Sequence, residues 1–516
     1  MKAGRTANAK ETPVKRRTVV MGLTAAAAVP TAGFTLGSQA SGATVAKSSD
    51  PLVFDKDAYT VLTTAISTDD GDKEVTYHFH KAVTYVAEPV DEKYQSLNVS
   101  VPVTIDGKAV DAHGAPILFS NSVGGYMPSS VADATGVGDG APGGGPGGGM
   151  PKMVSNAKLA LAAGYVVVEP GARGRTLVDS AGTYYGTAPA AIVDLKAAVR
   201  YVRHNKGRIP GNTDRIVSSG TSAGGALSAL LGASGDSPLY DPHLRELGAA
   251  EASDAIFASG DWCPIADLEH ADMAYEWNWG GNKLGSGQLV DQTVSKELGS
   301  AFADYQASLR LKGKDGFGTL TARNYDAYLV KTYLEPAATT YLKALSDSDR
   351  ASYLSQNPFI TWSADKATFT WADFLEHVGA RKKDAPAFDP FGLSSPENNL
   401  FGTGTTKARH FTLYSLRHAT GNDSARLDSD LPKKLDLMNP MHFLGQHNPR
   451  RAKHWWIRVG IKDSDTSLTV VGNLAACLEN LGDDVNAAMY WDAGHGANED
   501  AGDFITWIGK VTGYRK

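Results

Sequence analysis

One serine of the sequence lies in a setting that could make its hydroxyl a nucleophile. Ser222 stands in the pattern Gly-x-Ser-x-Gly, between Gly220 and Gly224, and follows the apolar residues 216–217. The Ala- and Leu-rich stretch 223–231 comes next and predicts a helix. A glycine-framed turn between a strand and a helix lifts the hydroxyl clear of the backbone. The pattern therefore favours a nucleophile over a serine that only caps the helix.

A serine hydroxyl is a poor nucleophile by itself, so a base and an orienting acid must come later in the chain. Among the thirteen histidines, His495 is the best candidate base because it lies in a glycine-flanked loop after the last apolar run. Asp463 and Asp465 follow the preceding run, and either could accept the imidazole N–H. From the residues alone, Asp463 is the first choice and Asp465 is the alternative.

Two backbone N–H groups must also face the oxyanion that forms when a serine attacks an ester carbonyl. Ala223, the residue after the serine, is expected to supply one of them. Gly124 and Gly125, in the segment Asn-Ser-Val-Gly-Gly-Tyr after an early apolar run, are expected to supply the other. A plain glycine turn is the alternative for this segment.

The elements that would position these residues alternate between short apolar runs and helical stretches, which predicts a mostly parallel sheet covered on both faces. The preceding Thr-, Val- and Tyr-rich stretch, 52–103, predicts antiparallel strands. The predicted parallel strands are 116–119, 165–168, 215–218, 254–257, 454–459 and 485–491. The predicted helices include 189–205, 300–311, 325–346 and 468–481. Ligands bind at the carboxyl ends of such strands, where the candidate residues fall.

The chain is longer than one ordinary core, at 516 residues. We expect a signal segment at 1–40, a first core part at 41–262, an inserted lid at 263–451 and a second core part at 452–516. The insertion loses the alternation of strands and helices, and a separate binding domain is the alternative. The glycine- and proline-rich stretch 135–150 predicts a mobile surface loop and lacks the features of a phosphate-binding loop.

The first residues have the features of an export signal. Adjacent arginines, Arg16 and Arg17, precede a weakly apolar run, 21–36, and small residues follow at 38–40. This pattern indicates twin-arginine-type export to the periplasm or the outside of the cell. A short membrane anchor is the alternative, but the run is too short and too rich in Gly, Thr and Ala to hold well in a bilayer. No stable membrane insertion is expected after the signal is removed.

Composition excludes several function classes. Hydrophobic residues make up 42%, the net charge is −6, and the basic residues are scattered, so no nucleic-acid partner is expected. The chain has only two cysteines, which excludes a disulfide framework. Cys263 and Cys477 are predicted to be two separately buried thiols, with a single bridge as the alternative.

Assembled in this way, the chain resembles the bacterial tannases, which are tannin acyl hydrolases of the α/β-hydrolase fold. The likeness runs from about residue 121 to residue 507. It rests on NSVGGY, GARGRT, GTSAGGALSALLGASG, CPIADLEHADMAYEW, PAFDPFG, PENNLFG and KDSDTS. It implies an α/β-hydrolase fold with a mostly parallel central sheet and a large inserted lid domain.

The resemblance also implies roles for individual residues. Ser222, Asp463 and His495 match the catalytic triad of the family, which decides between the two aspartates. The positions that bind the phenolic hydroxyls of the galloyl ring match Lys383, Glu397 and Asp465, with Lys382 as a neighbouring alternative for the lysine. Phenol hydroxyls donate to carboxylates and accept from ammonium groups, so these residue types suit that ring.

The resemblance implies a serine esterase that acts through an acyl-enzyme. It would release gallic acid from alkyl gallates and from the galloyl ester and depside bonds of tannins. Its partner would be a small polyphenol ester, and no metal or organic cofactor is expected. The alternatives are a broader aromatic or feruloyl carboxylesterase and, more remotely, an inactive hydrolase-fold binding protein. The adjacent-cysteine disulfide of the fungal tannase and feruloyl esterase pattern is absent.

Overall fold

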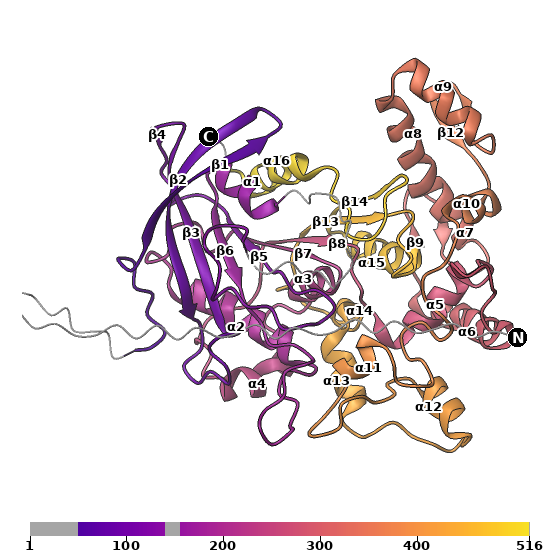
Figure 1. Ribbon diagram of the computed structural model, residues 1–516, viewed down its shortest axis with the longest axis horizontal. Coiled ribbons are helices and arrows are strands. Elements are labelled where there is room, and N and C mark those ends of the chain that lie inside the picture. Colours follow the sequence, from indigo (N-terminus) through magenta and orange to yellow (C-terminus); the bar gives the residue numbers. More distant parts are fainter. Residues whose placement is uncertain (1–49, 140–154, 515–516) are drawn as a thin grey trace, which may run out of the picture. The chain divides into compact units, whose positions relative to one another are not determined.

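The computed structural model describes residues 50–139 and 155–514 (Figure 1). The predicted signal segment and most of the glycine- and proline-rich stretch lie outside the described residues. The start of that stretch, 135–139, is packed and is not the mobile loop that we expected. The N–H of Val137 donates to the Tyr77 hydroxyl at 3.1 Å, and the N–H of Gly138 donates to the Glu169 carboxylate at 3.1 Å.

Ten strands of the described residues form one sheet. The strands are β1 (Thr60–Thr68), β2 (Gly71–Thr84), β3 (Ser96–Ile105), β4 (Lys108–Ala109), β5 (Ile117–Ser120), β6 (Val166–Pro170), β7 (Ile216–Thr221), β8 (Ala258–Trp262), β13 (His454–Gly460) and β14 (Asp484–Tyr490). Their order is β1-β2-β3-β6-β5-β7-β8-β13-β14, with β4 paired to β3. The pairs from β1 to β6 are antiparallel, and those from β6 to β14 are parallel. The predicted change from antiparallel to parallel strands is confirmed.

One predicted strand was wrong. The apolar pattern placed a strand at 254–257, but β8 begins at Ala258. Asp254 instead holds two basic side chains, with Lys196 at 2.7 Å and Arg200 at 2.8 Å. The true strand reads Ala-Ser-Gly-Asp-Trp and is completely buried. Glycine and aspartate are depleted in strands, so the residue types of this central strand did not predict it.

Helices cover both faces of the sheet. Gly232 of α3 (Ala223–Ala233) lies against Ser259, whereas the next residue, Gly260, lies against Phe504 of α16 (Ala501–Thr512). Successive side chains of a strand point to opposite faces, so α3 and α16 lie on different sides. Contacts place α1 with α16 and α2 with α3, while α15 packs on β13 and β14. The remaining bounds are α1 (Asn156–Ala162), α2 (Ala190–His204), α4 (Asp241–Glu246), α15 (Leu468–Asn480) and a 3₁₀ turn, η1 (Pro238–Tyr240).

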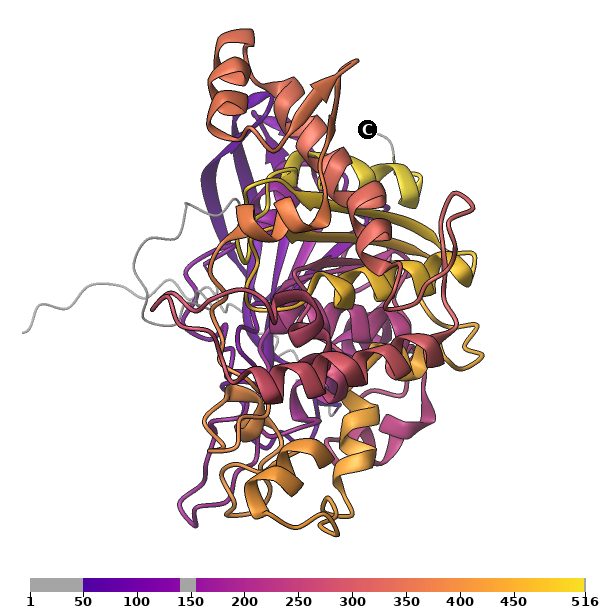
Figure 2. The ribbon, with the colours of Figure 1, turned by 90° about the vertical axis from the view of Figure 1, so that its right-hand side faces the viewer.

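A long insertion joins β8 to β13, and Figure 2 views the described residues from its side. Its helices are α5 (Leu268–Trp279), α6 (Gln292–Leu309), α7 (Tyr325–Leu329), a π-helical turn η2 (Val330–Leu334), α8 (Glu335–Ala344), α9 (Asp347–Gln356), α10 (Trp371–Val378), α11 (Pro396–Leu400), α12 (Leu413–Thr420), α13 (Leu431–Met438) and α14 (Pro440–Leu444). Two small hairpins, β9 (Lys312–Gly313) with β10 (Gly318–Thr319) and β11 (Thr361–Ser363) with β12 (Lys366–Thr368), complete it.

The insertion packs directly on the core. Its helices α5 and α7 contact α15, and α14 contacts α3. The fold is thus an α/β-hydrolase fold with a mostly parallel central sheet and a large inserted lid. The boundaries that we proposed for the individual domains stay predictions. Among the described residues, no helix combines the length and the apolar character that a bilayer crossing requires.

Candidate active site

Ser222 lies at the sharp turn between β7 and α3. Its backbone angles, φ 63° and ψ −123°, are rarely adopted by residues other than glycine. The turn is so tight that a Cβ on Gly220 would come within 2.2 Å of the Gly224 carbonyl oxygen. A Cβ on Gly224 would meet the Asn121 side chain at 2.6 Å. Both flanking glycines are therefore needed for close approach, as the sequence pattern predicts.

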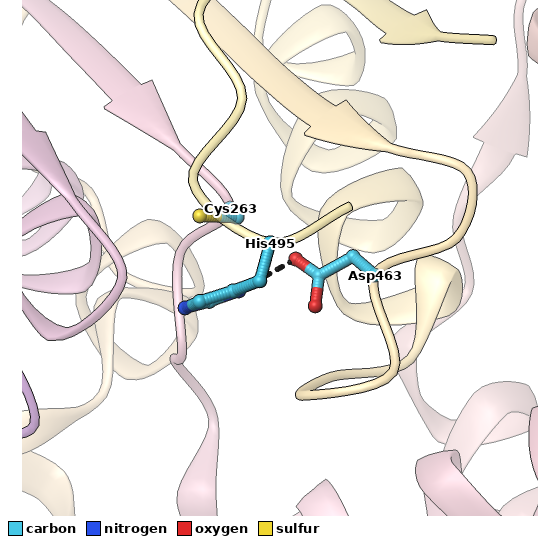
Figure 3. A group of neighbouring side chains, drawn as sticks. All are labelled: Cys263, Asp463 and His495. Atoms are coloured by element: carbon cyan, nitrogen blue, oxygen red, sulfur yellow. Dashed lines mark hydrogen bonds and ion pairs between the residues drawn. The ribbon is translucent and has the colours of Figure 1, made fainter. Parts of the chain in front are cut away.

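The structure brings Ser222, His495 and Asp463 together. His495 Nε2 lies 2.8 Å from Ser222 Oγ. Figure 3 shows the contact on the other side of the ring, where His495 Nδ1 lies 2.8 Å from Asp463 Oδ2. Asp463 is fully buried, and its Oδ1 accepts the N–H of Asp465 at 2.9 Å. The carboxylate on the imidazole is thus that of Asp463 and not that of Asp465.

The surroundings of His495 favour its imidazolium form. Burial alone would lower the pKa of His495, but its interactions with the Cys263 sulfur and with the Asp463 carboxylate raise it by more. The pKa of His495 therefore lies above its usual value. An imidazole in these surroundings is stabilised when it takes up a proton, which is what a general base must do during a reaction.

The predicted oxyanion donors line a common cavity with Ser222. Ala223 begins α3, and Gly125 lines the same cavity with a φ of 54°. Within the described residues, neither N–H donates a hydrogen bond to another group. Gly124 does not line the cavity; its carbonyl accepts the N–H of Met127 at 2.9 Å and closes a turn. Of the two predicted glycines, Gly125 is therefore the one at the cavity.

Arg175, in the motif GARGRT, holds the Gly125 peptide in place. Its Nε donates to the Gly125 carbonyl at 2.8 Å, and its main-chain N–H donates to the Tyr126 carbonyl at 2.9 Å. Its Nη1 also donates to Asn399 of α11 at 3.1 Å. One arginine thus links the segment 121–126, which we call the oxyanion loop, to the insertion.

Sequence reasoning missed the part played by Asn121. Its Nδ2 donates to the carbonyl oxygens of Ser219 at 3.2 Å and Gly224 at 3.1 Å, and its Oδ1 accepts the N–H of Val123 at 3.3 Å. This buried amide ties the oxyanion loop to the nucleophile turn. The available signal was a polar side chain directly after a strand that is otherwise apolar.

The cavity beside Ser222 has a volume of about 340 Å³ and has two walls. The core supplies one wall, with Ser222, His495, Ala223 and Gly125. The insertion supplies much of the other, with Ile265, Lys383, Asp384, Pro386, Ala387, Pro390, Ser394, Ser395, Pro396 and Glu397. The insertion therefore completes the cavity over the carboxyl ends of the strands.

All three residues predicted to bind the substrate ring line this cavity. Glu397 is only 6% exposed, and its carboxylate makes no hydrogen bond to another described residue. The Lys383 ammonium lies 3.5 Å from the centre of the Phe388 ring. Asp465 is bound by Lys382 at 2.7 Å, so the neighbouring lysine holds this carboxylate while Lys383 lines the cavity.

The charge state of Asp465 follows from its neighbours. Burial would raise the pKa of Asp465, but the positive charges of His495 and Lys382 outweigh it. Its pKa therefore lies below the usual value. The cavity thus presents an ionised carboxylate at Asp465, which can accept hydrogen bonds from a ligand.

Buried polar contacts fix the insertion segments that carry these residues. Arg381, next to the two lysines, forms an ion pair with Glu276 of α5 in which both side chains are fully buried; Nη1 lies 2.8 Å from Oε2. Asp272 of α5 accepts the N–H groups of Phe388 at 2.6 Å and Asp389 at 3.2 Å. The segment 381–389, which carries Lys383, is therefore attached to α5 at both of its ends.

The two cysteines are unbridged, which confirms the prediction of two separate thiols. Cys477, on α15, is only half-buried. Cys263 is buried and follows β8 directly, beside His495 (Figure 3). Its closeness to the imidazole was not anticipated from the sequence, because the two residues are far apart along the chain.

Comparisons with known proteins bear on the family. The family model described as BD-FAE matches residues 148–304. Esterase LipQ of Mycobacterium tuberculosis is 36% identical over 90 residues, which are 17% of this chain and 20% of that protein. Esterase LipC of the same organism is 38% identical over 77 residues, 14% of this chain and 19% of that protein. The chain thus matches about a fifth of each of these curated esterases.

Solved structures match far more of the chain. The tannin acyl hydrolase from Lactobacillus plantarum is 37% identical with a TM-score of 0.76, and the match covers 89% of this chain and 99% of that one. The Fusobacterium nucleatum tannase is 35% identical with a TM-score of 0.77 and the same coverage. A tannin acyl hydrolase in complex with ethyl gallate is 37% identical, with a TM-score of 0.76 and again the same coverage. From this likeness in sequence and fold over nearly the whole of each relative, the chain belongs to the tannase family of α/β-hydrolase-fold carboxylic ester hydrolases.

Proposed function

We propose that this protein hydrolyses galloyl esters, including alkyl gallates and the ester and depside bonds of tannins, and releases gallic acid. One observation carries the proposal. A single cavity is lined by Ser222 and His495 together with the polar groups of Lys383, Glu397 and Asp465. A related tannin acyl hydrolase is known in complex with ethyl gallate, which supports the same class of ligand here.

In the proposed reaction, Ser222 attacks the ester carbonyl while His495 Nε2 takes the hydroxyl proton. The 2.8 Å separation of these atoms supports this transfer. Asp463 keeps the other imidazole nitrogen protonated and stabilises the imidazolium that forms. The N–H groups of Ala223 and Gly125 stabilise the negative charge on the former carbonyl oxygen.

Collapse of the tetrahedral intermediate breaks the ester bond. His495 then gives its proton to the departing alcohol, and the galloyl group stays on Ser222 as an acyl-enzyme. Water that donates a proton to the same imidazole attacks the acyl carbonyl. The imidazole then returns a proton to Ser222 Oγ as the acyl bond breaks and gallic acid leaves.

The charged residues Lys383, Glu397 and Asp465 suit a ring with several hydroxyl groups. Phenol hydroxyls donate to carboxylates and accept from ammonium groups. The Glu397 carboxylate, which accepts no hydrogen bond from another described residue, is available to accept such a bond. A buried polar group left unpaired by a ring without hydroxyls opposes binding of that ring, so the same contacts give selectivity.

A panel of esters tests the proposal. We expect a higher kcat/KM for methyl gallate than for methyl ferulate and a short-chain nitrophenyl ester. Ser222→Ala should abolish turnover of every ester while the protein stays folded. Glu397→Gln should lower kcat/KM for methyl gallate by about tenfold to a hundredfold, because a hydrogen bond to a charged group is lost. The nitrophenyl ester should be affected much less.

The exposed Glu376→Gln variant is the matched control, since it changes a glutamate of α10 that does not line the cavity. Equal losses on the galloyl and nitrophenyl esters in Glu397→Gln would contradict a role in ring recognition. A preference for ferulate would favour the broader aromatic esterase. Full activity of Ser222→Ala would overturn the mechanism, and binding without turnover in the wild-type protein would favour an inactive hydrolase-fold protein.

We also propose export through a twin-arginine route, on the strength of Arg16 and Arg17 and the weakly apolar run after them. In a bacterial host, the wild-type protein should appear in the periplasm or the medium in its shortened form. The double variant Arg16→Lys, Arg17→Lys should accumulate unprocessed inside the cell. Equal export of the two proteins would contradict the proposal.

A further inference from the structure

We infer that Cys263, His495 and Asp463 form a binding site for a soft divalent metal ion such as Zn²⁺ or Cd²⁺, and that an ion bound there switches the hydrolase off. The switching part rests on the proposed function, because it requires His495 to be the base. The binding part does not.

The donor atoms of these three residues already lie close together. Within residues 50–139 and 155–514, this is the group whose sulfur, nitrogen and oxygen donors all fall within 4.8 Å of one another (Figure 3). Bonds from zinc to sulfur and to imidazole nitrogen are about 2.3 Å and 2.0 Å, so ligands of one ion lie about 3–4 Å apart. The donor atoms must therefore move together by about 1 Å when an ion binds.

The ligand types suit a soft or borderline ion. Thiolate and imidazole bind Zn²⁺ and Cd²⁺ well, whereas Mg²⁺ and Ca²⁺ prefer oxygen donors alone. The charges also balance, because the thiolate of Cys263 and the carboxylate of Asp463 together neutralise a divalent cation in a buried place. A net-neutral group is much less costly to bury than an isolated charge.

The site is open to a small ion from one side. His495 lines the cavity and its side chain is 24% exposed, whereas Cys263 is 2% exposed and Asp463 is fully buried. An ion that reaches the imidazole from the cavity would meet the buried sulfur and carboxylate next. Water from the cavity would complete the coordination, as in zinc sites with three protein ligands.

Binding would abolish base catalysis whichever imidazole nitrogen holds the ion. On Nε2, the ion displaces the contact with Ser222 Oγ. On Nδ1, it takes the place of the proton now shared with Asp463, and the neutral imidazole then carries its single proton on Nε2. Nε2 then donates to Ser222 Oγ and cannot accept its proton.

The exchange balances in atoms and charge. A sulfur–metal bond forms as the Cys263 S–H bond breaks, and the thiol proton passes to the solvent. The nitrogen–metal bond forms on the neutral imidazole, so a second proton held on His495 also passes to the solvent, whereas the oxygen–metal bond forms on an ionised carboxylate without loss of a proton. No electron is transferred, so removal of the ion by a chelator restores the starting state.

Cadmium provides a direct measure of binding that does not depend on activity. The Ser222→Ala protein, which we expect to be inactive, should be titrated with CdCl₂ while the thiolate-to-cadmium charge-transfer band is followed in the ultraviolet. We expect a band that saturates at one ion per protein. Adding Cys263→Ser should remove this band, whereas adding Cys477→Ser should leave it, because Cys477 lies on α15. A band that depends on Cys477, or no band, would overturn the site.

Activity measurements then test the switch. Turnover of a nitrophenyl ester, which lacks the metal-chelating hydroxyls of gallate, should be followed in increasing ZnCl₂, with each variant normalised to its own metal-free rate. We expect inhibition that EDTA reverses. In Cys263→Ser, half-inhibition should need at least about tenfold more zinc, and Cys263→Ala provides a second variant should the serine protein fold poorly.

The outcomes separate the two parts of the inference. Equal zinc sensitivity in wild-type, Cys263→Ser and Cys263→Ala proteins would overturn the switch. A cadmium band that requires Cys263, combined with an unaffected hydrolysis rate at saturating metal, would keep the site but contradict the role of His495 as the base. In that case the fault would lie with the proposed function and not with the metal site.

Discussion

Lys462 and Asp492 form an ion pair, with Nζ 2.7 Å from Oδ1, that joins the loop of the proposed catalytic acid to the loop of the proposed base. Lys462 directly precedes Asp463, and Asp492 lies three residues before His495. The main-chain N–H of Lys462 strengthens this link by donating to the Ala493 carbonyl at 2.9 Å. The Asp463–His495 contact is therefore supported by a second contact between the same two loops.

Asp492 also connects these loops to the insertion. Its carboxylate accepts the Tyr353 hydroxyl of α9 at 2.5 Å and lies 2.7 Å from His377 Nε2 of α10. The His377 ring stacks on Trp491, with 5.2 Å between ring centres. A single carboxylate thus holds together the acid loop, the histidine loop and two helices of the insertion.

We predict that Asp492→Asn lowers kcat for methyl gallate by about tenfold with little change in KM. The amide keeps the shape but loses the ion pair, so the imidazole is held less accurately, and small misplacements of catalytic groups are costly. Steady-state kinetics with a thermal melt of the same sample checks this. Asp484→Asn is the control, because that exposed carboxylate pairs with His454 at the other end of the strands. An effect on KM alone would contradict a positioning role.

Arg175 provides a test of the oxyanion site that is independent of the substrate ring. Arg175→Met removes the hydrogen bond to the Gly125 carbonyl, so the peptide that carries the donor is less well oriented. We expect kcat/KM to fall by about tenfold to a hundredfold for the galloyl and the nitrophenyl ester alike, since every ester forms the same oxyanion.

The exposed Arg208→Met variant controls for loss of an arginine elsewhere on the surface. Rates on both esters, measured with the two variants side by side, give the comparison. A loss confined to the galloyl ester would show that Arg175 acts through its contact with Asn399 and α11, and not through the oxyanion loop.

Breaking the buried pair of Arg381 and Glu276 should destabilise the protein strongly. Glu276→Gln leaves the Arg381 charge fully buried with no opposite charge, which typically costs about 3–5 kcal/mol. Urea unfolding curves of the variant and the wild type measure the difference. The double variant Arg381→Met, Glu276→Leu should recover part of the loss because no uncompensated charge remains. Lys56→Met, in an exposed pair with Asp57, should leave the unfolding curve unchanged.

Asp272 should make stability depend on pH. Burial, together with the nearby charge of Asp389, raises the pKa of Asp272 to about 7 in the folded protein. The unfolded chain loses this proton near pH 4, so from about pH 4 to about pH 7 only the folded state holds it. Stability from this group is present below that range and is lost as the pH rises through it.

Urea unfolding of the wild type and of Asp272→Asn at pH 5 and pH 8 measures this contribution. We expect the wild type to lose more stability over this interval, by on the order of 1–4 kcal/mol, than the variant, whose amide does not titrate. The exposed Asp304→Asn variant should behave as the wild type does. An identical pH dependence in the Asp272→Asn and wild-type proteins would contradict the prediction.

The sequence predicted the triad geometry because each of its members follows a strand of a parallel sheet, and the carboxyl ends of such strands meet at one edge. It failed at β8, whose small and polar residues carry no apolar pattern. It also could not choose between Lys382 and Lys383, because the directions of adjacent side chains in a loop depend on what the loop is fastened to. Asn121 and Asp492 act through contacts distant in sequence, which leave no local periodicity.

The division of the cavity between two stretches of chain separates the proposed catalytic groups from two of the three residues proposed to bind the ring, Lys383 and Glu397; the third, Asp465, lies in the core beside Asp463. The groups proposed to break the ester bond all come from the hydrolase core, whereas Lys383 and Glu397 come from a short span of the insertion. Substitutions within that span can change which acyl group is accepted while the reacting atoms stay where they are. A related enzyme with a different ester specificity would therefore need substitutions in little more than one loop and one turn of helix.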